Sequence, residues 1–134
     1  MKHYRYLLLA ILVSSVNAYA DQAKIEIVEQ FDNINMVAFI SINDVKESPA
    51  WDPGSDAPPL TINEAVQAVK KYTKNSKNPV DVKEIEIRRF PKHEGRWHYL
   101  IKIADDAMKS KYDIYVVLMD GKVIPAIIEP QGYK

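Results

Sequence analysis

The chain has 134 residues, and its 18 lysine and arginine side chains balance its 18 aspartate and glutamate side chains. A neutral balance provides no positively charged surface for nucleic acid or for anionic lipid. The sequence has no cysteine, which excludes disulfides, thiol catalysis, cysteine–zinc sites and a lipoprotein anchor.

The first twenty residues have the three parts of a secretory signal peptide. Lys2 and Arg5 form a basic start, residues 7–13 are an apolar run, and Ala-Tyr-Ala at 18–20 is a small-x-small cleavage pattern. The apolar run is too short to span a bilayer, and a retained membrane anchor is the alternative interpretation. We therefore expect cleavage after Ala20 and a periplasmic or secreted protein without a stable membrane anchor.

The region after the signal peptide predicts one or two strands and then a long loop. Residues 35–42 are rich in apolar and β-branched types and predict a strand, whereas residues 24–30 could form a strand or a helical turn. Residues 43–60 are rich in proline and predict a loop. Trp51 within it is expected to anchor the loop to the core, with a ligand contact as the alternative.

A helix is predicted to begin after Thr61. Thr61 and Glu64 have the spacing of a capping box, and apolar residues then recur on one face at helical spacing. The lysines in the last turn suit the negative end of the helix, and residues 75–79, which finish with a proline, are expected to end it.

The first of two predicted antiparallel hairpins has one apolar and one charged face. Residues 84–90 and 96–103 alternate on either side of a turn at 91–95. Pairing Phe90 with Arg96 places the isoleucines opposite apolar partners and the charged side chains opposite one another. We expect the apolar face to be buried and the charged face to be solvated.

The second hairpin is predicted to be apolar on both faces. Residues 112–119 and 122–129 flank Asp120-Gly121, which is a strong two-residue hairpin signal. Pro125 cannot donate to a ladder, so the last strand is expected at a sheet edge or bulged. One helix can cover one face only, so residues 24–42, a second subunit or a partner must cover the other. The candidate interaction surface comprises Tyr115, Val117, Met119, Ile124 and Ile128.

Together these elements predict a single α+β domain over residues 21–134, with one helix on a curled antiparallel sheet of about four strands and an additional N-terminal strand. Over residues 59–129 this arrangement resembles the PepSY-type domain and, more broadly, the cystatin-like fold. The resemblance is carried by the helix start at 59–65, the middle strand at 97–101, and the strand, Asp-Gly turn and Lys-Val exit at 112–123. It implies an exported binding or inhibitory module, because some members of the family sit in protease propeptides and are thought to restrain peptidases.

The sequence predicts no catalytic, cofactor or metal site. His93 and His98 lack the spacing of a zinc motif, and Asp105-Asp106 lacks the spacing of a calcium loop. The serines have no nucleophile-elbow context, and the glycines fall in separate predicted turns rather than in a phosphate-binding loop.

One pair of carboxylates leaves an alternative open. Glu84 and Glu86 could supply acid–base chemistry, but their position opposite Lys102 and near Arg88 favours ion pairs on a solvated face. If these two carboxylates and His98 converged in a deep pocket, that geometry would favour a small hydrolase.

The predicted function is therefore that of a non-enzymatic exported module that binds a protein, with a peptidase as one candidate partner. The alternatives are a self-associating structural or envelope-maintenance protein and a carrier of a small apolar ligand. A flat apolar sheet face would favour the binding module, and a closed cavity between helix and sheet would favour the carrier.

Overall fold

The computed structural model describes residues 23–74, 80–108 and 110–129. The predicted signal peptide, its cleavage site after Ala20 and the helix-ending segment 75–79 lie outside these described residues. Within the described residues, no helix is both long enough and apolar enough to cross a membrane.

Two helices and seven strands are formed by the described residues, and the strands build two antiparallel sheets. In chain order the elements are β1 (Lys24–Phe31), β2 (Ile34–Ser41), α1 (Ile42–Glu47), α2 (Ile62–Tyr72), β3 (Val82–Arg89), β4 (Trp97–Ala104), β5 (Tyr112–Leu118), β6 (Val123–Pro125) and β7 (Ile127–Ile128).

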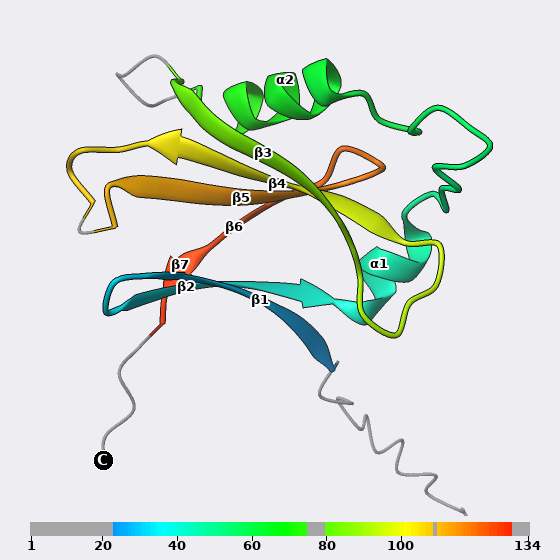
Figure 1. Ribbon diagram of the computed structural model, residues 1–134, viewed down its shortest axis with the longest axis horizontal. Helices are drawn as coiled ribbons and strands as arrows, with labels where there is room; N and C mark the ends of the chain where they lie inside the picture. The colour runs from blue at the N-terminus through cyan, green and yellow to red at the C-terminus, as the bar shows by residue number, and fades with distance from the viewer. Residues whose placement is uncertain (1–22, 75–79, 109, 130–134) are drawn as a thin grey trace, which may run out of the picture.

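The elements are arranged in three layers, as Figure 1 shows. The middle layer is a four-stranded sheet of order β3-β4-β5-β6, and α2 lies across one of its faces. A three-stranded sheet of order β1-β2-β7 packs against the opposite face. The α+β class is therefore established, and the middle sheet is buried on both sides.

The predicted curled sheet is wrong, because the four-stranded sheet is not wrapped around α2. The N-terminal region also contributes two strands instead of one. Phe31 pairs with Ile34 across a tight turn in which Asp32 has φ 48°, a left-handed conformation that aspartate tolerates better than most residues. The resulting hairpin supplies a separate flat layer, so the middle sheet can bury its second face without curling.

The predicted loop 43–60 is wrong at its start, where α1 forms. Ser41 caps this helix by accepting a hydrogen bond from the backbone N–H of Asp44, at 3.1 Å. Val45 is the buried residue of α1 and packs between the two sheets. A six-residue helix buries too few apolar positions to show a helical period in the sequence. The loop was therefore predicted from the prolines that follow α1.

The predicted start of α2 and the predicted β3–β4 register are confirmed. Thr61 caps α2 by accepting from the backbone N–H of Glu64, at 3.2 Å. The backbone N–H of Phe90 donates to the carbonyl of Arg96, and the pairs expected across β3 and β4 form. They include Ile85 with Ile101, Ile87 with Tyr99, Glu84 with Lys102 and Arg88 with His98.

The β5–β6 turn differs from the predicted two-residue turn by one residue. The backbone N–H of Leu118 donates to the carbonyl of Lys122, so the loop contains Met119, Asp120 and Gly121. Gly121 has φ 89°, the left-handed conformation that closes a three-residue hairpin loop. This shift pairs Ile124 with Val116 instead of with Val117, and it exchanges the faces of all β6 side chains.

The last strand region passes from one sheet to the other. β6 is the edge strand of the four-stranded sheet, as predicted from Pro125. After Ala126 the chain continues as β7, which pairs with β2 through Met36–Ile128 and Val37–Ile127. The two sheets are therefore joined by the main chain along the β6–β7 edge.

Candidate functional site

The five residues of the predicted interaction surface do not share one face. Tyr115, Val117 and Met119 are buried under α2. Ile124 packs between the two sheets, and Ile128 lies partly exposed on β7. The shifted β5–β6 register separates Ile124 from the other β5–β6 residues, so this set is not a continuous surface.

Both faces of the β5–β6 hairpin are covered by other elements of the same chain. α2 covers the side of Tyr115 and Val117, and the β1–β2 hairpin covers the side of Ile114, Val116 and Leu118. Residues 24–42 therefore occupy the face that a second subunit or a partner could otherwise have covered.

Trp51 lies where the loop after α1 meets the β3–β4 turn. Its ring makes an edge-to-face contact with Trp97 at 5.3 Å between centroids, and its indole N–H donates to the carbonyl of Asp56. Its backbone N–H donates to the carbonyl of Gly95 at 2.9 Å. The contacts with Trp97 and Gly95 hold this loop to the β3–β4 hairpin, and the bond to Asp56 joins two parts of the loop itself.

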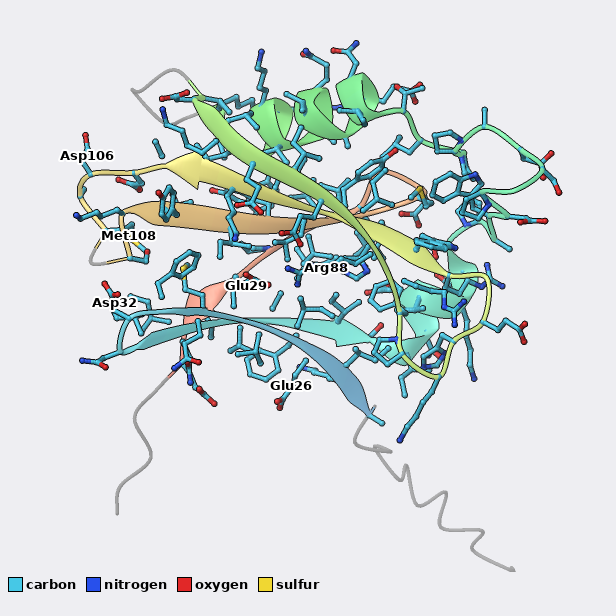
Figure 2. The ribbon with its side chains drawn as sticks, in the orientation of Figure 1. Glu26, Glu29, Asp32, Arg88, Asp106 and Met108 are labelled. Atoms are coloured by element: carbon cyan, nitrogen blue, oxygen red, sulfur yellow. The ribbon has the colours of Figure 1, made fainter. Side chains whose placement is uncertain are left out.

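The charged face of β3 and β4 is covered by β1 along one edge, so its predicted exposure to solvent is wrong there. Glu29 of β1 lies 2.5 Å from Arg88 and 3.3 Å from Lys102. Figure 2 shows Glu29 and Arg88 pointing toward one another between the two sheets. The Glu29 and Lys102 side chains are only 15% and 12% exposed, so this ion pair is largely shielded from water. We call Glu29, Arg88 and Lys102 the edge ion cluster.

Glu84 and Glu86 lie at the solvent side of the edge ion cluster. Glu86 pairs with Arg88 at 2.5 Å, and Glu84 pairs with Lys102 at 3.3 Å. Burial lowers the pKa of Arg88, but its bonds to Glu29 and Glu86 outweigh this and raise the pKa overall. The carboxylates thus act as structural ion-pair partners, as the sequence favoured, while the third partner Glu29 was missed because it comes from a distant strand.

His98 is the most unusual polar side chain of this face. It is 1% exposed, and neither ring nitrogen has a hydrogen-bond partner. Its ring contacts Phe90 at 4.3 Å between centroids. Burial, together with the cationic Arg88, lowers the pKa of His98 from its usual 6.5 to about 4. The ring is therefore neutral at pH 7 and is enclosed in the core.

A second shifted group lies on the α2 side of the sheet. Burial raises the pKa of Asp113 to about 6, and the neighbouring carboxyl of Asp105 adds to the effect. No group of three or more His, Cys, Asp or Glu side chains in the described ranges is placed to hold a metal ion. The raised pKa of Asp113 therefore follows from burial next to a second carboxyl.

The outer face of the three-stranded sheet carries a row of apolar side chains. Val28, Val37 and Ile127 are direct cross-strand neighbours from β1, β2 and β7. Val28 and Ile127 are 47% and 49% exposed, and nearby Phe39 is 39% exposed, whereas Val37 between them is only 1% exposed. Figure 1 shows that α1 and α2 both lie on the other side of this sheet. We call the three exposed residues Val28, Phe39 and Ile127 the outer apolar row.

Two pockets of about 380 and 340 Å³ lie at turns of the chain. The first is lined by residues 89–94 and the second by residues of the β1–β2 turn and the segment before β5. Neither pocket is lined by Glu84, Glu86 or His98, so these three side chains do not converge in either one.

Comparisons with known proteins give no relative for this chain. No family model matches it, no curated protein matches it, and no solved structure matches it. Its function must therefore be argued from its own geometry.

Proposed function

We propose that this protein is a non-enzymatic exported module that binds another protein through the outer apolar row. The single observation that carries this proposal is the outer face of the three-stranded sheet, where Val28, Phe39 and Ile127 are exposed and neither helix of the described residues covers them. Exposed apolar side chains gathered on one face are typical of a protein contact, whereas single ones are ordinary. Export is supported by the signal-peptide pattern that ends at Ala20.

The surroundings of the outer apolar row fit a protein partner. Polar and charged side chains from the same outward face border it, including Glu26 and Gln30 of β1. An apolar centre with a polar rim is the usual composition of a protein–protein contact. The resemblance to PepSY-type domains makes an exported peptidase one candidate partner.

A photo-crosslinking experiment tests this proposal. Phe39 is replaced by a benzophenone amino acid of similar shape, and Gln67, exposed on α2, is replaced in a control protein. After illumination of intact cells we expect a discrete adduct with a second protein from position 39 and none from position 67. We also expect Ile127→Lys to remove the adduct, because a charge in the apolar row cannot be desolvated cheaply.

The matched control for the added charge is Gln30→Lys, which adds a lysine on β1 at the rim of the same sheet face and should leave the adduct intact. An adduct with the mass of two copies of this chain would replace the proposal with self-association. An adduct of equal yield from positions 39 and 67, or one insensitive to Ile127→Lys, would overturn it.

A further inference from the structure

His98 occupies a position where an apolar side chain would satisfy the structure better. It is 1% exposed on β4 between the two sheets, with Phe90 against its ring and Leu118 as its neighbour on β5. A neutral imidazole has one donor and one acceptor, and here both are without a partner. Buried polar groups without partners destabilise a fold, so this histidine calls for an explanation beyond packing.

The charged groups around His98 cannot neutralise a protonated ring. Its direct cross-strand partner on β3 is Arg88, which is itself a cation. Glu29 of β1 and Glu86 of β3, the carboxylates nearest to Arg88, are both engaged by that arginine at 2.5 Å. Lys102, also on β4, adds a second cation, and Glu29 and Glu84 are both engaged by it at 3.3 Å.

Among the described residues, α1, β2 and β5 bring no unpaired carboxylate to this space. Asp44 of α1 is paired with Lys122 at 2.7 Å. β2 and β5 contribute only apolar side chains to the inter-sheet cluster. These side chains are Met36, Ala38, Ile40, Ile114, Val116 and Leu118, with Ile34 at the margin.

The two edges of the inter-sheet space are closed in different ways. At the β6–β7 edge the main chain passes from one sheet to the other, so the sheets cannot separate there. At the β1–β3 edge the closure is ionic and depends on Glu29 reaching Arg88 and Lys102. An extra positive charge beside Arg88 repels this arginine and weakens the ion pairs that close the β1–β3 edge. The β6–β7 edge, where the main chain joins the two sheets, is not affected.

We propose that His98 is an acid-responsive switch: when its ring takes up a proton from solvent, the three-stranded sheet separates from the four-stranded sheet at the β1–β3 edge. The separated form hydrates the imidazolium and exposes the apolar faces of both sheets. The α2 layer stays in place, because its contacts with the four-stranded sheet contain no histidine among the described residues.

The direction of the response follows from the two environments of the ring. Burial and Arg88 lower the pKa of His98 to about 4 in the closed form, while a hydrated ring keeps its usual 6.5. The open form therefore binds more protons between these values, and acidification through this range shifts the equilibrium toward it.

Hydrogen exchange of the intact protein, corrected for the intrinsic pH dependence of the amide rate, tests the switch. Between about pH 7 and pH 4 we expect residues 24–41 to lose protection at least tenfold more than residues 97–104. In His98→Leu this selective loss should disappear. His93→Leu, which changes the histidine of the β3–β4 turn, should behave like the wild type.

Three results would overturn the proposal. One is full protection of residues 24–41 at the acid end, and another is equal loss in both segments, which is ordinary acid unfolding. The third is an unchanged selective loss in His98→Leu, which would assign the response to Glu29 instead. If His98→Leu fails to fold, the ring of His98 is followed by NMR in the wild type: its protonation must coincide with the loss of protection in residues 24–41, and protonation before or without that loss would equally overturn the switch.

Discussion

The two faces of the four-stranded sheet are covered by chemically different layers. On the α2 face, Ala65 and Val69 of the helix are fully buried against Tyr99, and the Tyr99 hydroxyl donates to the carbonyl of Leu60. On the face toward the three-stranded sheet, the contact is apolar near β2 and β5 but ionic near β1 and β3.

This difference indicates how each layer responds to conditions. Apolar contacts do not depend on pH, so the α2 layer responds to acid mainly through Asp113 at its margin. On the other face, the proposed response of His98 depends on its protonation, and the ion pairs of the edge ion cluster are weakened by salt. The interface with the three-stranded sheet therefore depends on salt and on buried polar groups, whereas the α2 interface is mainly apolar, with Asp113 at its margin.

The largest expected effect comes from placing a charge on either side of β6. Ile124→Asp and Val123→Asp each put a carboxylate into a partly buried apolar site, and each should lower the free energy of unfolding by several kcal/mol. Urea denaturation measures the loss, and hydrogen exchange locates it. Ile124→Asp should loosen residues 24–41, and Val123→Asp should loosen α2.

The opposite assignment would contradict the observed register. If Val123→Asp loosened the β1–β2 hairpin and Ile124→Asp loosened α2, the β5–β6 turn would be the two-residue Asp120-Gly121 turn expected from the sequence.

A smaller effect is expected from the edge ion cluster. Glu29→Gln leaves Arg88 and Lys102 without their shared partner, and it should lower the free energy of unfolding by about 1 to 2 kcal/mol. Urea denaturation at low and high salt measures this, and the difference from the wild type should shrink at high salt.

The matched control is Glu26→Gln on the same strand. Glu26 is exposed and points away from the four-stranded sheet in Figure 2, so its neutralisation should change stability by no more than about 0.5 kcal/mol. Equal effects of the two substitutions would show that β1 carries no specific ionic contact with β3 and β4.

The smallest expected effect lies on the α2 face, where Asp113 has the opposite pH response from His98. The pKa of Asp113 is raised to about 6 by burial and by Asp105, so the folded protein binds this proton more tightly than the unfolded chain does. The group therefore stabilises the fold less as pH rises from about 4 to about 6.

Asp113→Asn removes this dependence and should be more stable than the wild type above about pH 6, by under about 1 kcal/mol because solvent screens the partly exposed carboxyl. Below about pH 4 the two proteins should melt together. Melting temperatures across this range measure the effect. A variant that differs from the wild type by the same amount at every pH would show that Asp113 titrates normally.

The sequence by itself determined the elements that have a strong local pattern. The α2 start follows from the Thr61 and Glu64 spacing, and the β3–β4 register follows from matching isoleucines on one face and opposite charges on the other. Pro125 restricted β6 to a sheet edge or a bulge, and β6 lies at the edge. In each case the deciding contacts lie within a few residues or across one hairpin, so they are written in adjacent sequence.

Only the tertiary structure decided which elements cover each face of the four-stranded sheet. Alternation makes the side of Glu84 and Lys102 polar, but the same pattern suits a solvated face and a face that meets a charge from another sheet. Glu29, which chooses between them, lies more than fifty residues earlier in the chain. Gly121 suits two-residue and three-residue loops equally well in sequence, so the β5–β6 register appears only in the structure, where Val123 packs on the α2 side and Ile124 packs between the sheets. The burial of His98 has two causes. Local alternation on β4 places its side chain on the face opposite α2, and the distant β1–β2 hairpin determines that this face does not reach water.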